Sequence, residues 1–133
     1  MDKFILDAPG APAAIGAYSQ GVVANGFVFT AGQLGIVPET GKLVSEDVGA
    51  QAGQVLKNLG AILAAADSTF DDVVRATIYL VDLADFAVVN EIYANVIGPR
   101  PPARVTIQVA GLPLGAKVEI EMIAVAGGEE RIK

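Results

Sequence analysis

The spacing of apolar residues changes several times along this chain between the period of a helix and the period of a strand. A fold that contains both helices and a sheet is therefore expected. From Val48 to Ala66 the apolar residues recur at intervals of three and four, which predicts an amphipathic helix with Asp47 as its N-cap. A second stripe of the same period predicts a helix over Leu83–Val96, which Gly98 and Pro99 end. Two helices with one apolar stripe each can cover one face of a single sheet.

Runs of β-branched residues, typical of strands, lie before, between and after the predicted helices. The pair Asn25-Gly26 favours a hairpin turn within residues 21–30, and a loop or second hairpin is expected over 33–45. Further strands are predicted over Val73–Val81, Ala103–Val109 and Lys117–Val125. We expect the last two to form a hairpin that sets Arg104 opposite Glu119. This order of elements indicates an α+β fold.

The face of the sheet that the helices leave uncovered is expected to be semi-polar. Every second residue of the later strands is predicted to lie on it: Arg75, Thr77, Tyr79, Arg104, Thr106, Gln108, Lys117, Glu119 and Glu121. This face is too charged for a second core, and Ile123 and Val125 make its edge too aliphatic for plain exposure to solvent. Either another copy of the chain covers it or it is an ordinary solvated sheet face, and the pattern favours neither.

Two residue types that the sequence lacks restrict its chemistry. The chain has no cysteine and no histidine, which excludes disulfides, thiol nucleophiles, imidazole bases and zinc sites with nitrogen or sulfur ligands. A net charge of −6 repels phosphate backbones, so no nucleic-acid partner is expected. With neither a long apolar run nor a signal peptide, we expect no membrane contact and a cytoplasmic location. The 133 residues suit one domain, 1–133, with 127–133 as a polar tail.

Arg104 and Glu119 are the residues of most chemical interest, and two interpretations of them stay open. The planar fork of an arginine matches a carboxylate, so Arg104 could anchor an acidic substrate while Glu119 orients or deprotonates water. Alternatively, the two form a cross-strand ion pair that serves the structure alone, which is the commoner case. Tyr18 is, by residue type alone, more typical of packing than of function.

Several separated motifs occur in the chain: Ala13–Gly21, Thr30–Gln33, Asp47–Ala52, Asp82–Phe86, Val89-Asn90, Pro102–Pro113 and Val118–Ala124. In this order they closely resemble the reactive intermediate deaminase (Rid, YjgF-like) family. The similarity covers essentially the whole chain apart from the last few residues. Agreement of all these motifs at once is far more specific than any single one.

The resemblance implies a chorismate-mutase-like α+β fold, with a mixed sheet, two helices on one face, and a homotrimer whose sheets form a central barrel. It implies active sites between subunits that hydrolyse enamine and imine acids to 2-keto acids and ammonia, with no metal or other cofactor. Substrates of this kind are 2-aminoacrylate, 2-iminopropanoate and 2-iminobutanoate. The alternative is a non-catalytic trimer that binds 2-keto acids or other small carboxylates and acts in regulation.

The family's motifs also assign roles to six residues of this chain. Arg104 matches the arginine that binds the substrate carboxylate, and Glu119 the glutamate that positions the attacking water. Glu119 is expected to be ionised, a state that a nearby Arg104 favours. Four further residues match positions that line the pocket or contact the ligand: Tyr18, Gly32, Phe86 and Thr106. The chain departs from the family where Thr106 replaces a common cysteine, Ala17 a common proline and Ala31 a common serine.

Overall fold

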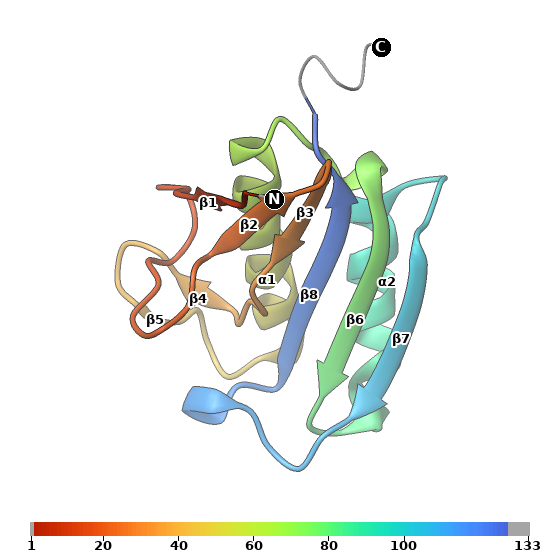
Figure 1. Cartoon of the computed structure of the whole chain (residues 1–133). Coiled ribbons are helices and arrows are strands. Elements are labelled where there is room, and N and C mark those ends of the chain that lie inside the picture. The colour runs from red at the N-terminus through yellow and green to blue at the C-terminus, as the bar shows by residue number, and fades with distance from the viewer. Residues whose placement is uncertain (1, 128–133) are drawn as a thin grey trace.

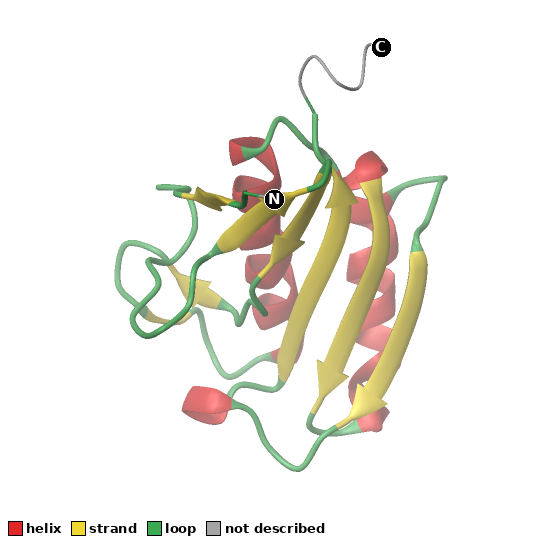
Figure 2. Ribbon diagram, in the orientation of Figure 1, coloured by secondary structure: helices red, strands yellow, loops and turns green. Residues whose placement is uncertain are grey.

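A six-stranded sheet with two α-helices on one face forms the body of the protein (Figures 1 and 2). A computed structural model describes residues 2–127, so the predicted tail at 127–133 lies outside the described residues from position 128 onward. The strands are β1 (Phe4–Leu6), β2 (Gly21–Ala24), β3 (Phe27–Thr30), β4 (Ile36–Val37), β5 (Lys42–Leu43), β6 (Val73–Leu80), β7 (Ala103–Gln108) and β8 (Val118–Val125). The helices are α1 (Val48–Ala65) and α2 (Phe86–Ile97), with short 3-10 turns η1 (Phe70–Asp72), η2 (Leu83–Asp85) and η3 (Pro113–Gly115).

The order of strands in the large sheet is β1-β2-β3-β8-β6-β7, and β4 pairs with β5 in a separate hairpin. Neighbouring strands are antiparallel except β6 and β7, which α2 connects as a parallel pair. The α+β class with a mixed sheet is confirmed. The predicted hairpin at Asn25-Gly26 is confirmed too, because both residues take positive φ, 56° and 83°, in the turn between β2 and β3.

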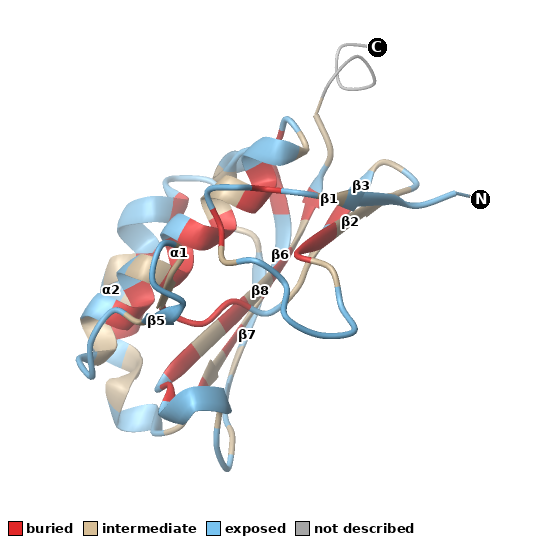
Figure 3. Ribbon diagram, turned by 90° about the vertical axis from the view of Figure 1, so that its left-hand side faces the viewer, coloured by how far each residue is buried: buried red, intermediate tan, exposed pale blue. Residues whose placement is uncertain are grey.

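Both helices pack against the same face of the sheet and enclose the core (Figure 3). Helix α1 begins at its predicted N-cap, where the Ala50 N–H donates a 2.8 Å hydrogen bond to Asp47 Oδ2. Completely buried residues come from the inner faces of the helices and from alternate positions of β6 and β8: Val55, Leu59, Leu63, Ala76, Ile78, Leu80, Val89, Val118 and Ile120. Among residues 2–127, neither helix combines the length and apolar character needed to cross a membrane.

The last two strands do not form the predicted hairpin. Strand β6 lies between β7 and β8, so Arg104 pairs with Ala76 of β6 and Glu119 pairs with Tyr79 of β6. No salt bridge joins Arg104 to Glu119. Alternation of apolar and polar residues is the same in a hairpin as in two strands that flank a third. The long connection over 109–117 is what allows the chain to pass the end of β6.

The face predicted for β7 is also wrong. Residues paired across two strands point to the same side of a sheet, and Ala76, the partner of Arg104, is a core residue beneath the helices. The polar residues of β7 therefore lie on the helix side: Arg104, Thr106 and Gln108. Val105 and Ile107 lie on the uncovered face instead. An edge strand tolerates this arrangement because solvent still reaches the arginine on its open side.

Buried amides of α1 fasten the segment 33–47 to the core. Asn58 Nδ2 donates to two backbone carbonyls of this segment at 2.9 and 3.2 Å, and Gln51 Nε2 donates to a third at 2.9 Å. Gly35 passes so close to α1 that a Cβ there would lie 2.8 Å from backbone atoms of Gln51. The segment and the helix are thus in direct backbone contact at one glycine.

We predict that Gly35→Ala lowers the free energy of unfolding by about 1–3 kcal/mol, because the added methyl group has no room beside the backbone of α1. The matched control is Gly53→Ala on α1, where nothing lies within 4 Å of the added Cβ. It should stabilise the helix by about 0.5–1 kcal/mol. Urea denaturation at one fixed protein concentration measures both, and equal effects of the two substitutions would contradict the close approach.

Candidate functional site

One face of α2 holds the side chain of Arg104. Its Nη1 donates a 2.7 Å hydrogen bond to Asn90 Oδ1. Its guanidinium carbon lies 5.4 Å from the ring centre of Phe86 and 5.1 Å from that of Tyr93. These three residues of α2 are four and three positions apart, so they share one side of the helix. Two aromatic rings and one amide therefore orient a guanidinium whose other N–H donors bond to none of the described residues.

A cavity of about 440 Å³ opens beside this arginine. It is lined by Arg104, Asn90 and Tyr93 and by mostly apolar neighbours, which include Ala94, Ile97 and Pro102. The hydroxyl groups of Tyr93 and Thr106 are buried and bond to none of the residues 2–127. Burial raises the pKa of Tyr93, against the opposing charge of Arg104, so the phenol stays protonated at neutral pH. A cation with free donors beside a small cavity suits a small anion.

Glu119 lies on the other face of the sheet, where its half-buried carboxylate contacts the turn at Gly32. A Cβ at position 32 would collide with Oε2 of Glu119. The next residue, Gln33, exchanges two backbone hydrogen bonds with Ile120, at 2.9 and 3.1 Å, and these hold the turn along β8. A side chain at position 32 would therefore push the Glu119 carboxylate out of its place, and glycine leaves the main chain there open to that carboxylate.

Two effects raise the pKa of the Glu119 carboxyl above its ordinary value. The larger is burial, which disfavours the charged form, and the second is the nearby negative charge of Glu121. The expected effect of a nearby Arg104 on Glu119 does not arise within one chain, because this arginine lies on the opposite face of the sheet. A carboxylate with a raised pKa is a stronger base than an exposed one.

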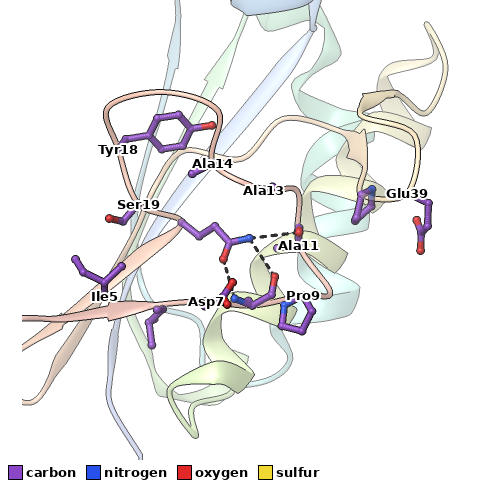
Figure 4. Close-up of a pocket in the computed structure, with 13 residues that line it drawn as sticks. Ile5, Asp7, Pro9, Ala11, Ala13, Ala14, Tyr18, Ser19 and Glu39 are labelled. Carbon is purple, nitrogen blue, oxygen red and sulfur yellow. Dashed lines mark hydrogen bonds between the residues drawn. The ribbon is translucent and has the colours of Figure 1, made fainter.

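Tyr18 lies on the long loop between β1 and β2, with its side chain 53% exposed. Figure 4 shows its ring near Ala14, above a cavity of about 550 Å³. At the end of the same loop, the Ala31 N–H donates a 2.8 Å hydrogen bond to the backbone carbonyl of Gln20. The loop that carries Tyr18 therefore adjoins the turn at Gly32 and not the arginine.

The residues predicted for the site, together with Asn90 and Tyr93 that the structure adds, fall into two groups on opposite faces of one chain. The arginine group comprises Arg104, Phe86, Asn90, Tyr93 and Thr106. The glutamate group comprises Glu119 and Gly32, with the loop of Tyr18 beside them. Sequence reasoning gave no role to Asn90 and Tyr93, although their spacing from Phe86 on one helix face was a usable signal. Within residues 2–127, no three His, Cys, Asp or Glu side chains gather as metal ligands do.

Comparison with known proteins identifies the family. The sequence model of the family described as "Endoribonuclease L-PSP" matches residues 9–126. A rat protein named 2-iminobutanoate/2-iminopropanoate deaminase is 48% identical over 123 residues, which are 92% of this chain and 90% of the rat protein. The chain belongs to this family, the Rid family. A second Rid relative, Reactive Intermediate Deaminase A, chloroplastic, from Arabidopsis thaliana, is 56% identical over 93% of this chain and 66% of its own length.

Solved structures of Rid proteins share the whole fold. The E. coli protein TdcF, crystallised with bound serine, has a TM-score of 0.88 and 41% identity over 93% of this chain and 99% of TdcF. A protein of the conserved Rid family from Yersinia pestis has a TM-score of 0.92 and 44% identity over 94% of this chain and all of its own. The resemblance seen in the separated motifs is confirmed by these two comparisons.

The raised pKa of Glu119 predicts a pH-dependent effect of Glu119→Gln on stability. A carboxyl group that holds its proton more tightly in the folded state lowers stability progressively as pH rises from its unfolded value through its folded value. The glutamine variant should therefore melt at a higher temperature than the parent at pH 7, and at the same temperature below about pH 4. Thermal unfolding across this range measures the difference. As control, Glu91→Gln removes one charge from the exposed side of α2; an equal gain from both variants would contradict the assignment.

Proposed function

We propose that this protein hydrolyses small 2-imino acids, formed directly or from enamines such as 2-aminoacrylate, to 2-keto acids and ammonia. The observation that carries the proposal is the guanidinium of Arg104, held between two rings with free donors beside a small cavity. The names of the rat and Arabidopsis relatives, both deaminases, point to the same reaction.

Arg104 binds the substrate carboxylate. A 2-imino acid of three or four carbons offers few other groups for recognition, and the planar fork of an arginine can donate two parallel hydrogen bonds to a carboxylate. Because Asn90 and the rings of Phe86 and Tyr93 already fix the guanidinium, little side-chain freedom is lost when the anion binds. The apolar wall at Ile97 and Pro102 faces a short aliphatic side chain. Phe86 contacts the guanidinium of Arg104, and Thr106 lies on the same face of β7 two residues further on.

Glu119 holds the attacking water and takes its proton. The water oxygen bonds to the imine carbon while one water proton passes to the carboxylate, and the protonated Glu119 gives this proton to the imine nitrogen, which yields a carbinolamine. The hydroxyl proton then passes through the same carboxylate to the amino nitrogen as the C–N bond breaks, so that ammonia leaves and the keto group forms. An imine carbon is already electrophilic, so placing the two reactants supplies much of the acceleration. The raised pKa of Glu119 suits this exchange of protons.

A complete site in this proposal requires two subunits of a homotrimer. The arginine group and the glutamate group lie on opposite faces of one chain, so neither can reach a substrate held by the other. A neighbouring copy that presents its glutamate group, with Tyr18 and Gly32, to the arginine group would bring the two together. A cleft between copies would also give the exposed ring of Tyr18 a surface to line.

The uncovered face of the sheet supports the same assembly. It carries large apolar side chains that are each 37% to 43% exposed: Phe27, Phe29, Val105, Ile107 and Val125. Between them the Tyr79 hydroxyl donates a 3.2 Å hydrogen bond to Glu121 Oε1. Apolar area of this kind, rimmed by polar groups, is typical of a surface that another protein covers. Three sheets packed as a barrel would bury it.

Two properties named for the family or for a relative, ribonuclease activity and a chloroplast location, are not assigned to this chain. Ribonuclease activity, which the family's description names, is not expected from a chain with a net charge of −6 and no histidine. The cytoplasmic location stays a prediction of the sequence, since the Arabidopsis relative is named a chloroplast protein.

We predict that Arg104→Ala abolishes both the accelerated hydrolysis of 2-iminopropanoate and the binding of 2-ketobutyrate, because a charge-assisted contact supplies about 1.5–3 kcal/mol of binding. Arg104→Lys should recover only part of it, since an ammonium lacks the planar fork. Glu119→Gln should keep 2-ketobutyrate binding and lose turnover, because an amide cannot accept the proton of the water. A serine dehydratase that generates the imine in situ, together with calorimetry, measures both properties.

Each variant should retain the sedimentation coefficient of the parent, which separates a lost site from a lost fold. Normal turnover by Arg104→Ala would overturn the assignment of the arginine. If the parent protein binds 2-ketobutyrate but accelerates no hydrolysis, the protein is a non-catalytic binding protein and the proposed activity is wrong.

A further inference from the structure

The side-chain amide of Gln20 forms hydrogen bonds with the first part of the loop that carries Tyr18, at residues 8–12. Its Oε1 accepts a 2.7 Å hydrogen bond from the Ala8 N–H. Its Nε2 lies 3.0, 3.3 and 2.8 Å from the carbonyl oxygens of Ala8, Ala11 and Pro12 and donates to them. One buried amide, only 5% exposed, therefore makes four contacts to a segment eight to twelve positions earlier in the chain.

The segment has few other hydrogen bonds. Pro9 and Pro12 have no N–H to donate, and the one backbone hydrogen bond within the stretch runs from the Ala11 N–H to the Ala8 carbonyl at 3.1 Å. Ala8 and Ala11 pack on Ile62, which supplies a small apolar contact. Leu6 and Ala61 pack against the same cluster, and the hydrogen bonds of the amide add a directional restraint to this small apolar contact.

The loop also spans a cavity and does not rest on a packed layer. The cavity of about 550 Å³ is bounded by Tyr18 and Ser19 on the loop and by Ile5, Asp7, Pro38 and Glu39 across from them. In Figure 4 the hydrogen bonds drawn as dashed lines reach the first part of the loop near Ala11, away from the ring of Tyr18. Removal of those bonds would leave the loop free to move into the open space.

The backbone of the same residue contacts the glutamate group. The Gln20 carbonyl accepts the 2.8 Å hydrogen bond from the Ala31 N–H, and Ala31 precedes Gly32. Gln20 thus connects two parts of the proposed pocket, with its side chain on the loop of Tyr18 and its carbonyl on the turn beside Glu119.

We propose that Gln20 is a positioning residue, which fixes Tyr18 relative to the turn at Gly32 so that both face the substrate. This inference rests on the proposed function, because it assumes that Tyr18 lines the imine pocket. Gln20 does not touch the substrate; its amide acts through the loop.

Fluorine NMR can follow the position of Tyr18 directly. The chain has three tyrosines and no tryptophan, so labelling with 3-fluorotyrosine gives three resonances that Tyr→Phe variants assign. We expect Gln20→Leu to shift and broaden the Tyr18 resonance and to leave those of Tyr79 in the sheet and Tyr93 in the core unchanged. A merely structural role would lower the melting temperature and leave all three resonances in place.

Two further variants keep the test decisive. Gln20→Glu preserves the length of the side chain and the Oε1 acceptor, but it replaces the Nε2 donor with an oxygen that faces three carbonyl oxygens. The Tyr18 resonance should therefore change in this variant as well. This variant keeps the test informative if Gln20→Leu folds poorly. Ser68→Ala is the control: it removes a buried hydroxyl that donates a 2.9 Å hydrogen bond to the Val125 carbonyl, and Ser68 does not line the cavity beside Tyr18. It should leave the Tyr18 resonance unchanged.

A kinetic double-mutant cycle completes the experiment. Gln20→Leu should lower kcat/KM for 2-iminopropanoate by about tenfold to a hundredfold, the cost of a misplaced pocket wall. In a Tyr18→Ala background the same change should cost less than about twofold, since the amide then has no tyrosine to position.

Full activity and an unmoved Tyr18 resonance in folded Gln20→Leu would overturn the inference about Gln20 while the proposed function stands. A full tenfold loss on top of Tyr18→Ala would also overturn it, because the amide would then act independently of the tyrosine. A parent protein without imine hydrolysis would overturn the proposed function instead, and the NMR result would remain a separate observation.

Discussion

The parallel pairing of β6 with β7 determines where every functional side chain of this protein lies. Helix α2 carries the chain from the end of β6 back to the start of β7, so β7 joins the outer side of β6, away from β8. In that register Arg104 lies over the helix side beside Ala76, within reach of Phe86, Asn90 and Tyr93. Glu119 lies on β8, on the other side of β6, and faces the opposite side of the sheet.

This separation has an electrostatic consequence. If Arg104 and Glu119 met in one chain, each would neutralise the other, and a substrate carboxylate would have to displace an ion pair in order to bind. Apart, the guanidinium keeps donors free for an anion, and the glutamate keeps a pKa raised by burial and by Glu121. The single chain thus folds with the two groups on opposite faces, and in the proposed trimer the contact between copies sets the distance between them.

The periodicity of apolar residues predicted which segments are helices and which are strands, but it did not predict which strands pair with each other in the sheet. The two helices, the cap at Asp47 and the hairpin at Asn25-Gly26 follow from local spacing and turn chemistry, and all were predicted from sequence. The pairing of β7 was not, because alternation shows which residues share a face without showing which face it is. Asn90 went unassigned for a related reason: its contact with Arg104 joins a helix to a strand that only the tertiary fold brings together. The Rid resemblance supplied the candidate residues of the site, and the structure shows that they are divided between two faces of the chain.

Subunit complementation tests the central claim, that one site uses Arg104 of one subunit and Glu119 of another. Arg104→Ala and Glu119→Gln chains, each inactive alone, are unfolded together in equal amounts, refolded and assayed for imine hydrolysis. Random trimers would contain sites with both residues intact at about one in four, so about a quarter of the parent activity should return. If both residues came from the same chain, no mixed site would be complete, and a mixture as inactive as its components would contradict the account.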